Sequence, residues 1–400
     1  MALRARQYTN KKVNKKSLLT KGIRDNFYAY NRQDDMIFQN QNDNLVDRFE
    51  DWWRRDNKGL PLMWVVARRD GAKTPSPPPK DDEDRYIGLD LKLGQTIANL
   101  KNNLYLADSY AQASSSIGPG SLAVYLGSKP VFAPNTVWYE PCIQDITNRQ
   151  PITFDPNGYW FKKHFDVLKE LKKAAGNNDY IVNFPDLVEN IDILAALRGT
   201  EELLIDMIDE PEAVSQALDE IYETYFPCYD LLYDALKTSE GISSFYCFCV
   251  IGRGKVAKVQ CDFSAMISPE HYRKFVLPTM KKQVKRLNHS VYHLDGPDAV
   301  RHLPAIMEIE ELDALQWTAG AGKPDGAAPC WYNIYDQVAA AGKCLWVQIY
   351  EGNVDNWIDR ADRFLDRYGT KACYLLCPGM SERDADKLMT HAHAHWVDSK

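Results

Sequence analysis

The sequence predicts an α/β protein, a closed (β/α)₈ or TIM barrel with a helical extension at its N-terminus. Three observations support this fold class. Short apolar stretches of strand length recur along the 400 residues, and helical patterns with recognisable ends separate most of them. Strand–helix alternation of this kind is typical of a parallel sheet. No glycine-rich phosphate loop follows a strand, so a closed barrel is favoured over an open doubly wound sheet.

The predicted strands are compact apolar runs bounded by turn residues. We assign the eight barrel strands to Leu62–Ala67, Leu122–Leu126, Tyr180–Phe184, Val256–Phe263, Ser290–Leu294, Ala314–Thr318, Leu345–Tyr350 and Ala372–Leu376. The aromatic and cysteine-rich stretch Phe245–Ile251 is interpreted as a flap or hairpin strand over the barrel mouth.

The predicted helices carry capping signals. Ser268-Pro269-Glu270 combines a cap with a proline at the first helical position and opens a helix to about Leu287. Further helices are expected over Asp298–Leu312, Trp331–Ala341, Asn353–Tyr368 and from Ser381 onward. The amphipathic run Leu45–Arg54 predicts one helix in the extension. We therefore divide the chain into a basic, helical extension (1–58) and a barrel domain (59–400).

Bulk properties exclude several classes of function. A net charge of −7 is unfavourable for general nucleic-acid binding, which needs a basic surface. No apolar run reaches the length of a membrane span, and no signal peptide opens the chain. Nine cysteines without a paired framework indicate reduced thiols. We expect a cytoplasmic protein that acts on a small molecule, with no nucleic-acid or membrane partner.

His293 and Asp295, in the strand Ser290–Gly296, are the most informative residues. A strand places them two residues apart on one face, at the carboxyl end where barrel active sites lie. Other reactive groups follow other strands in the same way. We expect Asp262 to join His293 and Asp295 in catalysis, and expect substrate contacts from Gln316, Trp317, Tyr292, Asp186 and Glu351.

One histidine, a carboxylate and two cysteines at strand ends are donors suited to zinc. We predict His293, Asp295, Cys261 and Cys377 as metal ligands, with zinc acting as a Lewis acid. Simpler interpretations stay open for each residue: the cysteines as core residues, and Asp295 as hydrogen-bond partner of His293. Asp262 could equally be salt-bridged, and Tyr292 and Trp317 could be packing. The tail His391, His393 and His395 is interpreted as a solvated helix end.

Several segments together resemble the uroporphyrinogen decarboxylase superfamily. The resemblance covers roughly residues 120 to 390, and the start Ser268-Pro269-Glu270 with the later His293-x-x-Gly296 strand end is its most specific combination. The segments that carry it are Ile193–Glu201, Asp262–Glu270, Phe275–Pro278, Tyr292–Pro297 and Leu312–Trp317. It implies a barrel fold independently of the strand pattern.

The two functional branches of that superfamily imply different sites. The decarboxylase branch has an Arg-Gln-Ala-Gly-Arg-Tyr motif, whereas this chain has Ala67-Arg68-Arg69-Asp70. The corrinoid-linked methyltransferase branch binds zinc through His-x-Cys and a cysteine after a Pro-Gly near the last strand. Here His293 matches, Asp295 replaces the first cysteine, and Cys377 precedes Pro378-Gly379. The resemblance thus implies an altered zinc site, suited to an oxygen or nitrogen substrate.

We therefore expect a methyltransferase-like enzyme that moves a methyl group from a small substrate to a corrinoid carried by a separate protein. The substrate would be a methoxylated aromatic compound or a methylamine. Two alternatives stay open: a decarboxylase or related lyase with Asp295 or Asp262 as proton donor, and a non-catalytic barrel that binds a corrinoid or tetrapyrrole. Whether the chain forms a homodimer is also left open.

Overall fold

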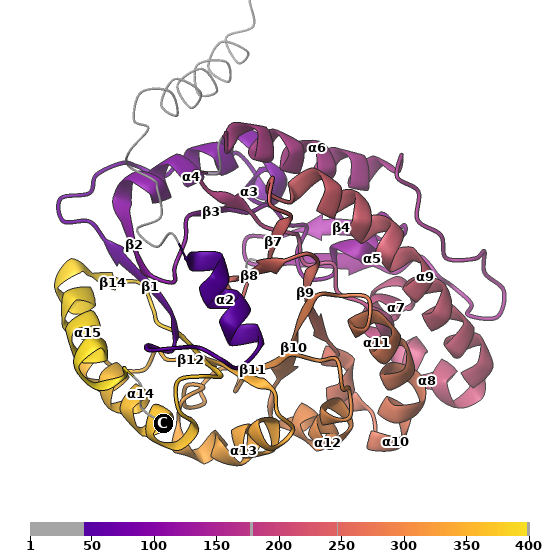
Figure 1. The fold of residues 1–400 in the computed structure, drawn as a ribbon. Helices are drawn as coiled ribbons and strands as arrows, with labels where there is room; N and C mark the ends of the chain where they lie inside the picture. The colour runs from indigo at the N-terminus through magenta and orange to yellow at the C-terminus, as the bar shows by residue number, and fades with distance from the viewer. Residues whose placement is uncertain (1–43, 177–178, 246, 398–400) are drawn as a thin grey trace, which may run out of the picture.

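A computed structural model describes residues 44–397, with the exception of 177–178 and 246. The described chain is a mixed α/β protein with a mostly parallel central sheet (Figure 1). Its hydrogen-bonded order is β14-β1-β13-β12-β11-β10-β9, and β2 pairs antiparallel with β1. These strands are β1 (Leu62–Arg68), β2 (Asn103–Ala107), β9 (Val256–Gln260), β10 (His289–Asp295), β11 (Ala314–Thr318), β12 (Cys344–Gln348), β13 (Cys373–Leu376) and β14 (Met380–Ser381).

Three two-stranded sheets complete the described strands. β3 and β6 are parallel, while β4 with β5 and β7 with β8 are antiparallel hairpins. An isolated parallel bridge between Phe184 and Phe245 connects the end of β6 to β7. The strands are β3 (Gln112–Ala113), β4 (Lys129–Phe132), β5 (Val137–Glu140), β6 (Ile181–Val182), β7 (Ile242–Phe245) and β8 (Val250–Arg253).

Helices surround the sheet, and α2 lies in front of its middle in the view of Figure 1. No described helix combines the length and the apolar character that crossing a bilayer requires. The helices are α2 (Leu45–Trp53), α3 (Asp82–Ile87), α4 (Leu89–Asn102), α5 (Ser121–Tyr125), α6 (Tyr159–Ala174), α7 (Asn190–Arg198), α8 (Thr200–Asp209), α9 (Pro211–Leu236), α10 (Pro269–His271), α11 (Leu277–Val284), α12 (Leu303–Met307), α13 (Tyr332–Ala340), α14 (Val354–Tyr368) and α15 (Glu382–His395).

Most predicted elements are confirmed with small shifts of their ends. The capping predictions also hold: Ser268 and Ser381 each accept a backbone hydrogen bond from the third residue of the helix they open, and Asn353 forms a capping box at α14. The helical prediction for Leu45–Arg54 is confirmed by α2, while the rest of the predicted extension up to residue 43 lies outside the described residues.

One predicted strand is wrong. Leu122–Leu126 belongs to the helix α5, whose five residues are all buried. A short apolar run without polar alternation fits a buried helix as well as a buried strand, so periodicity could not separate them. The strand at this point of the chain is the two-residue β3, which pairs with β6 and is too short to give a sequence signal.

The sheet has two buried faces, which we call inner and outer. The inner face packs against α2 and the β7–β8 hairpin in one hydrophobic cluster, and the outer face packs against the surrounding helices in another. Successive side chains of a strand point to opposite faces. In β10, Val291 belongs to the inner cluster, whereas Tyr292 and Leu294 belong to the outer one.

The sequence suggested a flap or hairpin strand over the barrel mouth at Phe245–Ile251. The structure has a hairpin here, β7–β8, but it packs against the inner face of the sheet. The backbone carbonyl of Phe248 accepts a hydrogen bond of 2.8 Å from Trp346 Nε1, and that of Cys249 accepts one of 2.8 Å from Tyr374 Oη. The Phe248 ring lies 5.4 Å from the ring of His293, centroid to centroid. Aromatic residues of the hairpin therefore form the floor beneath the carboxyl end of β10.

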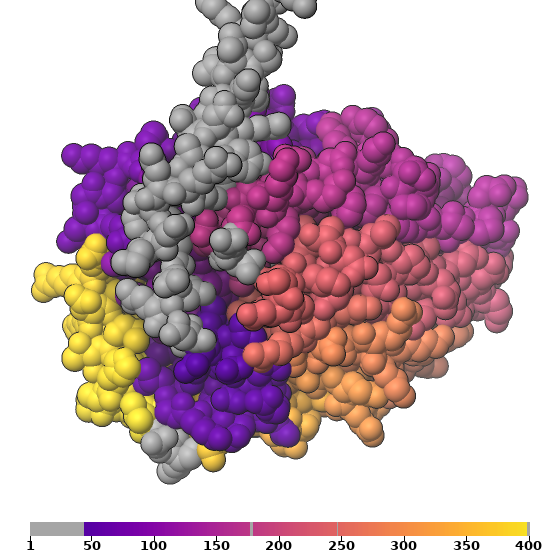
Figure 2. All heavy atoms as spheres, turned by 45° about the horizontal axis from the view of Figure 1, so that its top comes forward, coloured from indigo at the N-terminus to yellow at the C-terminus, as the bar shows by residue number. Residues whose placement is uncertain are grey.

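Helix α2 closes the amino end of the sheet. Trp52 Nε1 donates to the carbonyl of Ala372, just before β13, and Cys344 Sγ at the start of β12 donates to the carbonyl of Trp52. In the space-filling view of Figure 2 this first described segment, in indigo, lies between the yellow C-terminal helix and the orange part of the chain. The opposite, carboxyl end of the strands is left for the site described below.

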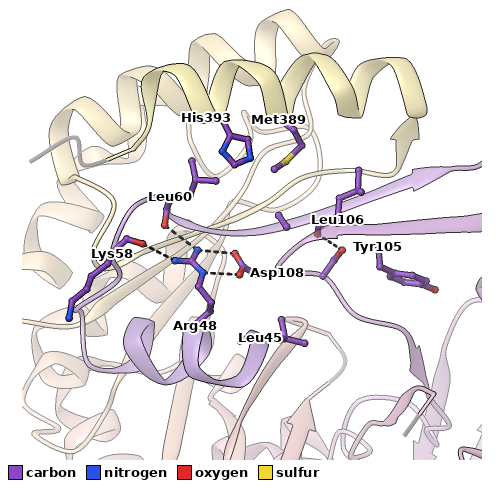
Figure 3. Close-up of a pocket in the computed structure, with 11 residues that line it drawn as sticks. Leu45, Arg48, Lys58, Leu60, Tyr105, Leu106, Asp108, Met389 and His393 are labelled. Atoms are coloured by element: carbon purple, nitrogen blue, oxygen red, sulfur yellow. Dashed lines mark hydrogen bonds and ion pairs between the residues drawn. The ribbon is translucent and has the colours of Figure 1, made fainter. Parts of the chain in front are cut away.

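A cavity of about 420 Å³ lies beside α2, between β2 and α15 (Figure 3). Arg48 points into it and forms a two-pronged ion pair with Asp108, with both bonds at 3.0 Å. The same guanidinium also donates to the carbonyls of Lys58, Leu60 and Pro61. Arg48 thus ties α2 to the chain entering β1, and this cavity lies at the end of the strands away from His293.

Candidate functional site

Three side chains converge at the carboxyl end of the inner face. His293 and Asp295 project from β10 on the same face, as the two-residue spacing predicted. Asp262 comes from the 3₁₀ turn Asp262–Met266 that directly follows β9. One ligand atom from each of Asp262, His293 and Asp295 lies within 4.8 Å of the others, and this is the only such group of histidine, cysteine and carboxylate side chains in the described residues.

The hydrogen bonds of His293 determine its tautomer. Gln316 Nε2 donates to Thr318 Oγ1 at 2.8 Å, so Gln316 presents its Oε1 to His293 Nδ1, with which it is hydrogen-bonded. Nδ1 must therefore carry the proton, which leaves Nε2 with a free lone pair in the neutral ring. Burial lowers the pKa of His293, and the ammonium of Lys258 lowers it further. A neutral imidazole can accept a proton or bind a metal through Nε2.

Asp262 is held by a chain of polar groups that begins in the buried interior. Lys258 Nζ forms an ion pair of 2.8 Å with Asp186 Oδ2 and also donates to Gln260 Oε1. Gln260 Nε2 in turn donates to Asp262 Oδ2 at 2.9 Å. Lys258 and Gln260 alternate with outward-facing residues of β9, so both project from the inner face below Asp262.

The start of α7 brings two further carboxylates to the same place, Glu189 just before the helix and Asp192 in its first turn. Glu189 Oε1 accepts from the backbone N–H of Gln260 at 2.6 Å, and Asp192 accepts from the backbone N–H groups of Asp262 and Phe263. Val188 and Asn190, on either side of Glu189, have φ angles of 55° and 49°. A β-branched residue in this left-handed region is strained by roughly 1–3 kcal/mol, so the surrounding contacts must impose this conformation.

These carboxyl groups hold their protons more tightly than usual. Burial raises the pKa of Glu189 to about 8, partly offset by Lys258 and the Gln260 N–H. Burial and the charge of Asp262 raise the pKa of Asp192 to about 6. Asp262 keeps contact with solvent, yet desolvation and the neighbouring carboxylates also raise its pKa against the opposing effect of Lys258. The site therefore contains groups able to hold or release a proton near neutral pH.

Neither predicted cysteine joins the group. Cys261 and Cys377 are buried in the outer cluster with the surrounding helices, because each falls one residue out of phase with the inward-facing side chains of its strand. Burial raises the pKa of both thiols, that of Cys377 to about 12. The structure brings together His293 and Asp295 from the predicted ligand set and supplies Asp262, which we had expected in catalysis, as the third donor.

Four of the five predicted substrate-contacting residues fall into two sets. Gln316 and Asp186 lie in the site, bonded to His293 and Lys258 respectively. Tyr292 and Trp317 point to the outer face, where Tyr292 Oη bonds Tyr272 Oη at 3.1 Å and Trp317 packs against Trp331. Tyr292 and Trp317 are therefore packing residues of the outer face, which was the simpler interpretation left open from the sequence.

Glu351, the remaining predicted contact, follows β12 and forms an ion pair of 2.9 Å with Arg360. In the C-terminal histidine tract, His391 Nε2 is hydrogen-bonded to Asp362 at 2.8 Å, and the His391 ring is tilted against that of His395, with 4.4 Å between ring centroids. His393 lines the cavity beside α2. None of the three belongs to a group of described side chains that could hold a metal.

Lys258, Gln260 and Asp192 are central to the site but were not singled out from the sequence. A signal for the first two existed, because a lysine and a glutamine at alternate positions of an otherwise apolar strand are unusual for a buried face. Asp192 gave none, since an acidic residue in the first turn of a helix is common. Its role depends on the approach of α7 to the turn after β9.

The donor set of the group fits a divalent metal. One imidazole nitrogen and two carboxylate oxygens are ligands that zinc accepts. Hydrogen bonds from neighbouring side chains orient two of the three donors, Gln316 at His293 and Gln260 at Asp262, which is the arrangement that metal sites use. Without a metal the same residues could bind a polar substrate group or transfer a proton.

The fold and the group together define a mixed α/β protein with a polar, acidic site at the carboxyl edge of a mostly parallel sheet. No family model and no curated protein sequence matches the chain. Among solved structures it is similar to a methyltransferase from Methanosarcina mazei, with a TM-score of 0.56 and 12% sequence identity. The similarity covers 88% of this chain and 98% of the other. At this identity it shows a shared fold.

Proposed function

We propose that this protein is a metal-dependent, methyltransferase-like enzyme on a (β/α)₈ barrel of the uroporphyrinogen decarboxylase type. The observation that carries the proposal is the convergence of Asp262, His293 and Asp295 within 4.8 Å at the carboxyl ends of β9 and β10. Barrel enzymes build their active sites at that end of the strands. The fold shared with a methyltransferase over nearly all of both chains supports the same class.

The barrel itself is part of the proposal. Six neighbouring strands, β1, β13, β12, β11, β10 and β9, run parallel in one sheet. Between the two ends of that path, the short strands β3 and β6 and the bridge to β7 supply further parallel pairs. Two hydrophobic clusters, one inside and one beneath the helices, are what a closed barrel would have.

Zinc, held by His293 Nε2, Asp262 and Asp295, would act as a Lewis acid toward the heteroatom that carries the methyl group. A corrinoid on a separate protein would supply the cobalt that accepts the methyl group. Gln316 would hold His293 in the tautomer that keeps Nε2 free. The hydrogen bonds from Lys258 to Gln260 and from Gln260 to Asp262 would keep the Asp262 carboxylate turned toward His293. The neighbouring carboxyl groups would exchange the proton that the demethylated heteroatom requires.

Metal analysis and a methyl-transfer assay test this function. The purified protein should bind one zinc, and should methylate cob(I)alamin from a methylated amine or methoxylated aromatic compound, read by the change in the cobalt absorption spectrum. His293→Ala should abolish both zinc binding and transfer. Because Cys377 points away from the site, Cys377→Ala should keep both. Protein that binds no metal and transfers no methyl group from either substrate class would overturn the proposal.

One observation favours a second candidate, a decarboxylase or related lyase. Acid catalysis needs a carboxyl group that stays protonated near neutral pH, and burial raises the pKa of Glu189 to about 8 and that of Asp192 to about 6. The two functions differ in their response to chelators. Loss of carbon dioxide from a carboxylate substrate at an undiminished rate in excess chelator would select the lyase.

A further inference from the structure

A cavity of about 410 Å³ opens beside Asp262. The β4–β5 hairpin, the start of α7 and the 3₁₀ turn after β9 enclose it. It shares Gln260 and Asp262 with the site, so a molecule bound there would touch the proposed metal group. Its volume lies in the range of ordinary small-molecule pockets.

The walls of this cavity are apolar and aromatic. Val188, Ile193, Phe263 and Met266 line one side, and Trp138 and Tyr139 of β5 line the other. The side chain of Trp138 is 66% exposed, and that of Met266 is 49% exposed. Large apolar side chains left open beside a reactive centre are suited to the body of an organic ligand.

The electrostatic character of the cavity is acidic. Asp192 and Asp262 line it, and no lysine, arginine or histidine is among its lining residues in the described chain. Lys258, which donates to the lining residue Gln260, is already paired with Asp186.

Acidic and aromatic walls in one cavity favour a positively charged guest. A carboxylate attracts an ammonium group directly, and the faces of Trp and Tyr attract cations through their ring electrons. The same walls disfavour an anionic guest, because like charges repel and no cation in the wall would compensate them. A substrate with several carboxylates is therefore unsuited to this cavity.

We infer that the cavity binds an organic amine as its cation, with the charged nitrogen beside Asp262 and an apolar or aromatic body against Trp138. This inference rests on the proposed function for its meaning, since it names the class of methylated substrate: an amine and not a methoxylated ring. An ammonium nitrogen has no lone pair for zinc, so the bound amine would first pass its N–H proton to a neighbouring carboxylate, and zinc would act on the free amine. The positive charge, more than the apolar body, would give the cavity its selectivity.

Three ligands that share one ring test the inference: benzylamine as the cation, benzyl alcohol as the neutral analogue and benzoate as the anion. Calorimetric titration of the zinc-loaded and the metal-free protein, at a pH where the amine is charged, should show benzylamine binding about tenfold more tightly than benzyl alcohol. Benzoate should not bind. Equal binding of the amine and the alcohol, or competition by benzoate, would overturn the inference.

Two pairs of variants separate charge from shape. Asp262→Asn should reduce benzylamine affinity to that of benzyl alcohol while keeping the alcohol's own affinity, which shows that the cavity remains folded. Asp386→Asn removes another exposed carboxylate, on α15, and should change neither affinity. Trp138→Ala should weaken both ligands, whereas Tyr159→Ala, which removes another side chain that is 66% exposed, should weaken neither.

The outcomes distinguish this inference from the proposed function. Methyl transfer from a methoxylated aromatic compound, without selective binding of the amine, would refute the inference and leave the function standing. If the amine binds selectively and through Asp262, but no donor transfers a methyl group, the proposed function is refuted. The inference that the cavity binds an organic amine would still stand.

Discussion

Gln260 Nε2 donates to Asp262 Oδ2 at 2.9 Å, while Gln260 Oε1 accepts from Lys258 Nζ. The lysine therefore decides which end of the amide faces Asp262, because an ammonium can only donate. Lys258 is itself fixed by the buried ion pair with Asp186. The orientation of the third donor of the site thus originates in a charge pair on the inner face of the sheet.

Gln260→Leu should weaken zinc binding by roughly 10–100-fold, which is the usual cost of removing a group that orients a metal ligand. Competition with a fluorescent chelator measures the affinity. Gln348→Leu is the matched control, since Gln348 lies at the end of β12, three strands away from β9 in the sheet. Equal affinity in the two variants would show that Gln260 does not orient the site.

The cysteines and the proposed ligands should respond differently to substitution. Cys261→Ala and Cys377→Ala should leave zinc affinity unchanged, because both thiols face the outer cluster. His293→Ala and Asp295→Asn should each abolish stoichiometric zinc, as measured by atomic emission after dialysis. If a cysteine variant loses zinc but still unfolds cooperatively, the cysteine is a zinc ligand, as the sequence suggested.

Glu189 should make the stability of the protein fall as pH rises. Its folded-state pKa of about 8 lies above the value of about 4.3 expected in the unfolded chain. Between these values the folded state holds a proton that the unfolded chain has lost, so the free energy of unfolding decreases with pH. The slope from this group is at most about 1.4 kcal/mol per pH unit.

Glu189→Gln mimics the protonated side chain and should remove this contribution. Urea unfolding between about pH 5 and pH 8 should show the wild-type protein losing stability relative to the variant as pH rises. Glu223→Gln, at an exposed position of α9, should keep the wild-type dependence. Parallel curves for wild type and Glu189→Gln would show that Glu189 ionises normally in the folded state.

Trp52→Ala should cost about 3–5 kcal/mol of folding stability. The side chain is fully buried, and its Nε1 donates to the carbonyl of Ala372 at 3.0 Å. Trp138→Ala, at an exposed position, should change the free energy of unfolding by no more than about 0.5 kcal/mol. If Trp52→Ala unfolds like the wild-type protein, α2 is an appendage and not part of the core.

Much of the fold could be predicted because its signals are local. The capping residues Ser268, Asn353 and Ser381 each act within one helical turn, and all three begin helices as expected. Strands such as Ala314–Thr318 are apolar and flanked by turns, and β11 has these bounds. The segment Leu122–Leu126 failed because length and composition alone do not distinguish a buried helix from a buried strand.

The shared face of His293 and Asp295 was determined by the sequence, because side chains alternate along any strand. The same rule separates Cys261 from Lys258 and Gln260. Asp262 was expected in catalysis at the end of the predicted strand Val256–Phe263, but it lies in the 3₁₀ turn after β9, where the alternation does not apply. That residue reaches His293 through the hydrogen bonds of Gln260 and Asp192.

The sequence by itself thus determined seven of the eight strands that we assigned, the helices with capping signals and the pair at the end of β10. Asp262 was also expected in the site. Only the tertiary structure decided that it is the third donor in place of the cysteines, which residues orient it, and that an acidic, aromatic cavity adjoins it. These features depend on contacts between the Asp186–Asp192 loop, β9 and the β4–β5 hairpin, which are far apart in the chain. Local propensity and periodicity describe neighbours in sequence, and these contacts are between neighbours in space.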